Sequence, residues 1–100
     1  MKATTLSLEE WSNIKKQLFK GKESNFLINL YYRWLDEKAF EDIKEYKIAI
    51  EKNIKLVGFN YKIVKMNKRP FGFDFQIRKQ IFTLYMKNNT LGIKFLRNVL

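Results

Sequence analysis

The side chains available for chemistry are lysines, tyrosines and carboxylates, because the chain contains no cysteine and no histidine. Without these two residue types there is no disulfide, thiol nucleophile, cysteine-ligated or histidine-ligated metal, imidazole base or Ser-His triad. The sequence also contains no phosphate-binding loop, no dinucleotide fingerprint and no nucleophile elbow. We therefore expect a protein that is not an enzyme and that uses no metal and no cofactor.

The most acidic stretch of the chain spans residues 36–45. Its carboxylates are Asp36, Glu37, Glu41, Asp42 and Glu45. The tripeptide from residue 45 to residue 47 also has the E-x-K spacing of some nucleases. Carboxylates at helical spacing that alternate with lysines are typical of a solvated helix face, and a two-metal site needs carboxylates from different elements. We interpret the stretch as a solvated face, with a surface for a basic partner as the alternative.

Charge is distributed unevenly along the chain. The 100 residues include 20 Lys and Arg against 10 Asp and Glu, which gives a formal net charge of +10. Residues 1–51 contain equal numbers of the two kinds, whereas residues 52–100 contain a single acid, Asp74. All of the excess positive charge therefore belongs to the second half, which indicates a surface for a polyanionic partner.

Basic side chains and one tyrosine of the second half form the candidate binding surface. On the outer face and turns of a sheet they would attract phosphates and release counterions on binding, and an exposed tyrosine could stack on a base. The candidate residues are Lys62, Lys65, Lys68, Arg69, Arg78, Lys79, Tyr85, Lys87 and Lys94. The alternative is a solubilising face, because lysine predominates over arginine and bidentate phosphate recognition favours arginine.

Helical periodicity dominates the first half. Ser7 and Glu10 form a capping box that predicts a helix over residues 8–19, and Gly21 can close it. Apolar residues at helical spacing predict a second helix from about residue 25 and a third from about residue 36 to residue 53. These two could also form one longer, bent helix. Within the second helix, Tyr31 and Trp34 are predicted core residues, although their composition also suits an interface hot spot.

After residue 54 the apolar residues recur at period two. This pattern predicts strands over residues 57–63, 71–78, 81–87 and 91–97, of which the last could equally be a terminal helix. Turn residues separate them at 67–70 and 88–89. Phe71, Phe73 and Phe75 are predicted core residues, unlike the exposed stacking aromatics of an RNA-recognition domain.

The predicted fold class is α+β, in a single domain over residues 1–100. Two or three N-terminal helices, in the neutral segment 1–54, pack on one face of a three- or four-stranded antiparallel meander in the basic segment 55–100. The opposite sheet face is expected to be wet. The longest uncharged stretch, residues 24–32, is too short to span a bilayer. We expect a cytoplasmic monomer or homodimer with no membrane partner.

The segments Tyr31–Glu37 and Lys65–Phe73 resemble stretches in small accessory proteins of phages and mobile elements from low-GC Gram-positive bacteria. That group includes the anti-CRISPR proteins. The resemblance implies a phage-type, non-enzymatic protein that inhibits or regulates a nucleic-acid-handling complex of the host, such as a CRISPR effector. Many anti-CRISPR proteins are acidic mimics of DNA, so a basic chain would bind guide RNA, DNA or an acidic protein surface instead. The alternative function is an autonomous DNA- or RNA-binding protein with low sequence specificity.

Overall fold

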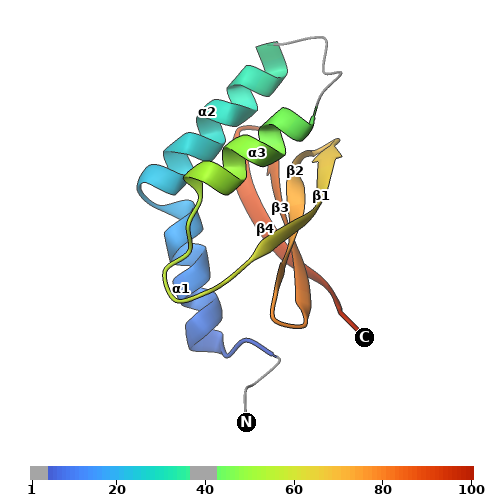
Figure 1. The fold of residues 1–100 in the computed structure, drawn as a ribbon. Coiled ribbons are helices and arrows are strands. Elements are labelled where there is room, and N and C mark those ends of the chain that lie inside the picture. The colour runs from blue at the N-terminus through green and yellow to red at the C-terminus, as the bar shows by residue number, and fades with distance from the viewer. Residues whose placement is uncertain (1–4, 37–42) are drawn as a thin grey trace.

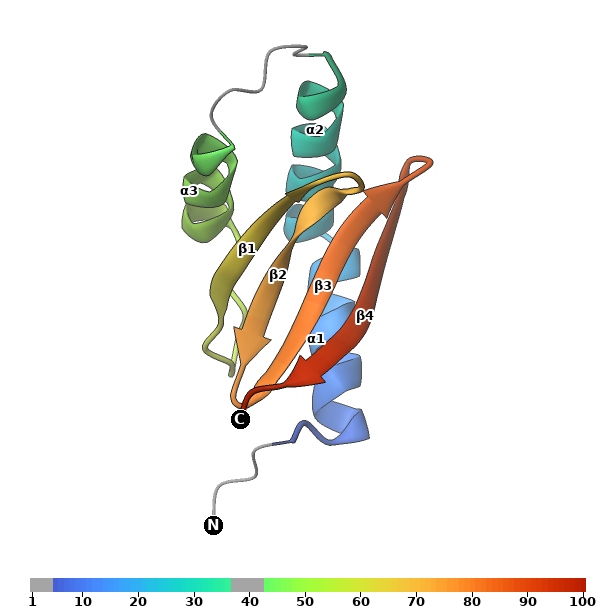
Figure 2. The ribbon, with the colours of Figure 1, turned by 90° about the vertical axis from the view of Figure 1, so that its right-hand side faces the viewer.

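The fold is three helices followed by a four-stranded antiparallel sheet, in a computed structural model that describes residues 5–36 and 43–100. The elements are α1 (Leu8–Phe19), α2 (Lys22–Asp36), α3 (Lys44–Asn53), β1 (Lys62–Lys68), β2 (Phe71–Ile77), β3 (Gln80–Lys87) and β4 (Thr90–Asn98). The strand order β1-β2-β3-β4 is that of a meander. All three helices lie on one side of the sheet (Figure 1), and the turned view looks onto the uncovered face (Figure 2). The predicted α+β architecture is confirmed.

The helices follow the predicted pattern closely. The Ser7 hydroxyl accepts from the Glu10 amide at 3.1 Å, and the Glu10 carboxylate accepts from the Ser7 amide at 3.0 Å, so the capping box starts α1 as expected. The second helix begins at Lys22, earlier than predicted, because Gly21 turns the chain at φ +79° directly into it. No helix in the described ranges has both the length and the apolar run that crossing a bilayer requires.

The two later helices are separate elements, since α2 ends at Asp36 and α3 begins at Lys44. The predicted first part of the third helix lies outside the described residues. The same holds for three members of the acidic stretch, which are Glu37, Glu41 and Asp42.

The first strand was predicted too early in the sequence. Residues 57–61 form a loop, because the backbone of Val57 binds the side chain of Gln17 on α1. The Val57 amide donates to Oε1 at 2.7 Å, and its carbonyl accepts from Nε2 at 3.1 Å. Gly58 then turns the chain at φ +88°. The period-two pattern arises because Phe59 and Tyr61 of this loop pack against the core. The other three strands are present, and residues 90–98 form a strand rather than a helix.

The core is built on the helix-facing side of β2. Phe71, Phe73, Phe75 and Ile77 alternate along this strand and are each at most 2% exposed. Phe71 stacks on Trp34 of α2, with ring centroids 5.0 Å apart, and meets the edge of Tyr46 of α3 at 5.6 Å. One aromatic side chain therefore anchors two helices on the sheet.

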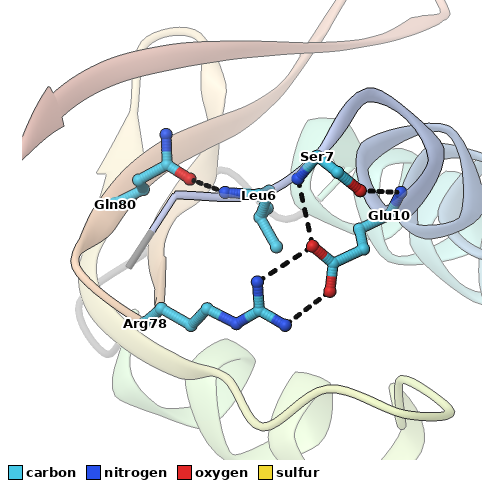
Figure 3. A network of polar contacts seen from close by, with 5 residues as sticks. All are labelled: Leu6, Ser7, Glu10, Arg78 and Gln80. Atoms are coloured by element: carbon cyan, nitrogen blue, oxygen red, sulfur yellow. Dashed lines mark hydrogen bonds and ion pairs between the residues drawn. The ribbon is translucent and has the colours of Figure 1, made fainter. Parts of the chain in front are cut away.

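A second link joins the beginning of α1 to the turn between β2 and β3 (Figure 3). The Arg78 guanidinium donates two hydrogen bonds to the Glu10 carboxylate, at 2.9 and 2.5 Å, and the Leu6 amide donates to the Gln80 side chain at 2.7 Å. The hydrogen bonds from Arg78, followed by that from the Ser7 amide, lower the pKa of Glu10 from its ordinary 4.5 to about 2. The same pairing raises the pKa of Arg78.

The Glu10–Arg78 pair predicts a specific dependence of stability on pH. A carboxylate whose pKa is lowered by folding stabilises the fold above about pH 4.5 and loses that contribution as the pH falls through about 2. Urea denaturation should therefore show a smaller loss of unfolding free energy between about pH 5 and about pH 2 in Glu10→Gln than in the wild type. An identical pH dependence in the two proteins would contradict the role of this pair.

The packing of Phe71 predicts a large effect of truncation. Phe71→Ala should lower the free energy of unfolding by about 3 to 5 kcal/mol, because it leaves a cavity between β2 and two helices. Tyr32→Ala, at a neighbouring α2 position that is 45% exposed, should cost less than about 1 kcal/mol. Equilibrium urea unfolding of both variants measures the difference, and equal losses would show that the helices are anchored elsewhere.

Candidate nucleic-acid interface

The uncovered face of the sheet is organised in rows that cross all four strands. Residues directly opposite one another on neighbouring strands share a face. One row consists of Lys65, Asp74, Thr83 and Lys94. The next row consists of Asn67, Gly72, Tyr85 and Gly92. The first row contains a carboxylate between two lysines, and the second contains an aromatic ring between two glycines.

Two β-bulges bring further cations to this face. Strict alternation from Ile63 would turn Lys65 toward the helices, but the register shifts between these two residues and Lys65 joins the open face. On β4 a second shift leaves Leu96 unpaired and places Arg97 opposite Ile81, again on the open face. Arg97 was missing from the candidate residues, because a bulge interrupts the period-two pattern and leaves no clear signal in the sequence.

A groove of about 1190 Å³ opens on this face and continues round the end of the sheet toward α2. Asp74 and Thr83, which are 8% and 7% exposed, lie at its floor. Tyr31, Trp34 and Leu35 of α2 line its other end. Four exposed cations surround it, namely Lys68, Arg69, Lys87 and Lys94. Asp74 is the one acid among the residues that line this groove, and it is mostly buried.

The middle of the open face is less wet than predicted. Asp74, Thr83 and Ile81 all belong to the two central strands and are at most 8% exposed. Their short side chains lie between longer ones from the edge strands, including Lys65 and Lys94 in the same row as the first two. The sheet therefore presents a hollow with a basic rim rather than a flat solvated surface.

The structure gathers five of the nine predicted site residues at this groove. They are Lys68, Arg69, Tyr85, Lys87 and Lys94. Lys65 flanks the groove in the row that contains Asp74. Lys62 lines a smaller hollow of about 240 Å³ at the other end of the strands, together with Arg78. Lys79 lies in the adjacent turn, and the Arg78 guanidinium is bound by the Glu10 carboxylate. These last three residues are not part of the groove.

Tyr85 lies across the glycine of the neighbouring strand. A β-carbon at Gly92 would fall against the Tyr85 ring, within 2.6 Å of its hydroxyl oxygen. On the other side, a β-carbon at Gly72 would meet the backbone of β3, including the Tyr85 Cα at 2.8 Å. The ring thus covers Gly92, whereas Gly72 is buried against the backbone of β3. Asn67, Asp74 and Thr83 line the groove together with the Tyr85 ring.

Among the described residues, the nuclease-like and metal-binding alternatives considered from the sequence are not brought together as a site. Glu45 and Lys47 are both exposed on α3, with the buried Tyr46 between them, and Lys47 pairs with Glu51 at 3.9 Å. Within residues 5–36 and 43–100 there is no group of three carboxylates that could hold a metal ion. Trp34 packs on the core, as expected, but also lines the groove.

The fold and the groove define an α+β protein in which helices cover one face of a β-meander and the other face is hollowed and basic. No family model matches the chain, and no curated protein or solved structure is significantly similar to it. Its function must therefore be argued from the groove itself.

The two glycines of the open face predict different responses to the same substitution. Gly72→Ala places a methyl group against the backbone of β3, which cannot move without separating the strands, so we expect a loss of about 3 kcal/mol. Gly92→Ala displaces only the end of a flexible tyrosine side chain and should cost less than about 1 kcal/mol. Urea unfolding compares the two variants. Equal costs would argue against the close approach of β2 and β3.

Proposed function

We propose that this protein binds single-stranded nucleic acid in the basic groove of its open sheet face. The main support is that four exposed cations, from the β1–β2 and β3–β4 hairpins, surround one groove that contains Tyr85. Phosphates of a bound strand pair with the cations and release counterions. Aromatic and apolar side chains, among them Tyr31, Trp34 and Tyr85, also line the groove, and they favour unstacked bases over the closed surface of a duplex.

The rim and the interior of the groove suit different parts of a nucleotide. Lys68 and Arg69 extend from the turn between β1 and β2, and Lys87 from the end of β3, so their charges lie at the rim where a backbone passes. The Tyr85 ring projects from β3 two residues before Lys87 and lies inside the groove. A base stacked on this ring has its phosphates within the rim of positive charge, which is the general arrangement of sequence-tolerant single-strand binding.

We further propose that the bound strand belongs to a nucleic-acid-handling complex, such as a CRISPR effector, which the protein inhibits or regulates. The observation that favours this second step is that both segments with a resemblance to phage proteins line the groove. Tyr31, Trp34 and Leu35 come from the first segment, and residues 67–71 from the second. Pull-down from a low-GC Gram-positive host lysate, with and without nuclease treatment, separates a complex from free nucleic acid.

Charge reversal tests the groove directly. Lys68, Arg69, Lys87 and Lys94 changed together to Glu should lower affinity for a labelled single-stranded oligonucleotide by about 100-fold or more at about 50 mM salt. In the wild type, four phosphate contacts predict a slope of log affinity against log salt of about −3 for a single strand. Fluorescence anisotropy measures both quantities. Arg78 is left unchanged because it stabilises the fold.

A matched control reverses the same number of charges on the helical side. The four control residues are exposed and do not line the groove. Three of them lie on the helices and the fourth is the C-cap of α1: they are Lys16, Lys22, Lys52 and Lys20. Their reversal changes the net charge equally, so we expect a loss of less than about tenfold, through long-range attraction alone. Equal losses in the two variants, with the fold intact by circular dichroism, would contradict binding at the groove.

A further inference from the structure

Asp74 is a buried acceptor at the floor of a groove that is otherwise basic. It is the single acid of residues 52–100, and it is 8% exposed. Asn67 Nδ2 donates to Oδ1 at 2.8 Å, and this is the one hydrogen bond to the carboxylate among the described residues. Although Lys65 and Lys94 occupy the same cross-strand row, neither forms an ion pair with Asp74. The second oxygen, Oδ2, is therefore available to a ligand in the groove.

A carboxylate in this position selects for a ligand that carries N–H donors. It repels phosphates, so its place in a polyanion site is unfavourable unless a donor reaches it. The exocyclic amino group of cytosine is such a donor, and Asp and Glu accept from this group in base recognition. Uracil presents a carbonyl oxygen at the same ring position, which a carboxylate repels. A buried acceptor left without its donor costs more than an exposed one, which increases the discrimination.

The neighbouring residues place a base beside Asp74. Tyr85 pairs with Gly72, and Asp74 follows two positions further along β2 on the same face. Asn67, Asp74 and Thr83 line the groove together with Tyr85. A base stacked on the Tyr85 ring would therefore have the carboxylate and the Thr83 hydroxyl beside its edge, with its phosphates at the basic rim.

We propose that Asp74 is a base-reading residue, which accepts a hydrogen bond from the amino group of a base bound in the groove beside Tyr85. The inference rests on the proposed function, because it needs a strand in the groove. It adds a preference for amino-bearing bases, seen most simply as cytosine over uracil.

The test compares three labelled 12-nucleotide DNA strands by fluorescence anisotropy at about pH 7.5 and about 50 mM salt. The strands are oligo(dC), oligo(dU) and an oligomer of 2-pyrimidinone deoxynucleotide, which has hydrogen in place of the amino group. The wild type should bind oligo(dC) about tenfold more tightly than oligo(dU), with the 2-pyrimidinone strand between them. In Asp74→Asn this preference should fall to about onefold. The affinity for oligo(dU) and the 2-pyrimidinone strand rises because a negative charge is removed, whereas oligo(dC) gains less because it loses its hydrogen bond to the carboxylate.

Glu45→Gln is the matched control, since it removes one exposed carboxylate on α3 and should keep the tenfold preference. Equal wild-type affinity for all three strands, with tighter binding of all by Asp74→Asn, would overturn base reading but retain the groove. If affinity is insensitive both to Asp74→Asn and to the fourfold charge reversal, the proposed function itself fails. Should Asp74→Asn not fold, the wild-type comparison of oligo(dC) with the 2-pyrimidinone strand still decides, because equal affinities there overturn the proposal.

Discussion

Phe71 packs against Trp34 and Tyr46 at the boundary between the helices and the sheet. It joins the helical half of the chain to the sheet half, because Phe71 begins β2 and its two partners belong to α2 and α3. Phe71 also follows directly after the turn that carries Lys68 and Arg69. The packing of the core therefore sets the position of the basic rim, and Trp34 contributes both to the core and to the wall of the groove.

The alternation of β2 produces the core and the floor of the groove from the same seven residues. Phe71, Phe73 and Phe75 point to the helices, whereas Gly72 and Asp74 point to the open face. Both faces of this strand are in use, one in the core and one beneath the longer side chains of the edge strands. Most of its residues are therefore buried, even though no helix covers one side of the sheet. The alternation also couples function to stability, since a shift of register by one residue would exchange the two sets.

The distribution of charge supports a one-sided interaction surface. The helices carry balanced charge, so a polyanion approaching the molecule meets its strongest attraction at the open face and the hairpin ends. Arg78 has a structural role instead. Its guanidinium donates to the Glu10 carboxylate and connects the start of α1 to the turn between β2 and β3. The groove contains one acid, Asp74, among four cations. In the proposed function, this contrast would give the site a chemical selectivity that a uniformly basic surface lacks.

Features that depend on near neighbours along the chain can be predicted from the sequence. Four features have local signals of residue type or period. They are the capping box, the last three strands, the turn at Asn88 and Asn89, and the confinement of excess charge to residues 52–100. The sequence also identified the four cations and Tyr85 of the groove, because cations in turns and at strand ends are recognisable once the strands are placed.

Which of these residues lie together in space depends on long-range contacts of the folded chain. Three features have no local signal in the sequence. They are the bulges that turn Lys65 and Arg97 to the open face, the Gln17 contacts to the loop over residues 57–61, and the pairing of Arg78 with a residue 68 positions away. The buried position of Asp74 likewise depends on the strands beside it. A period in the sequence specifies how a segment folds on its own, whereas register shifts and ion pairs depend on what the folded chain brings next to it.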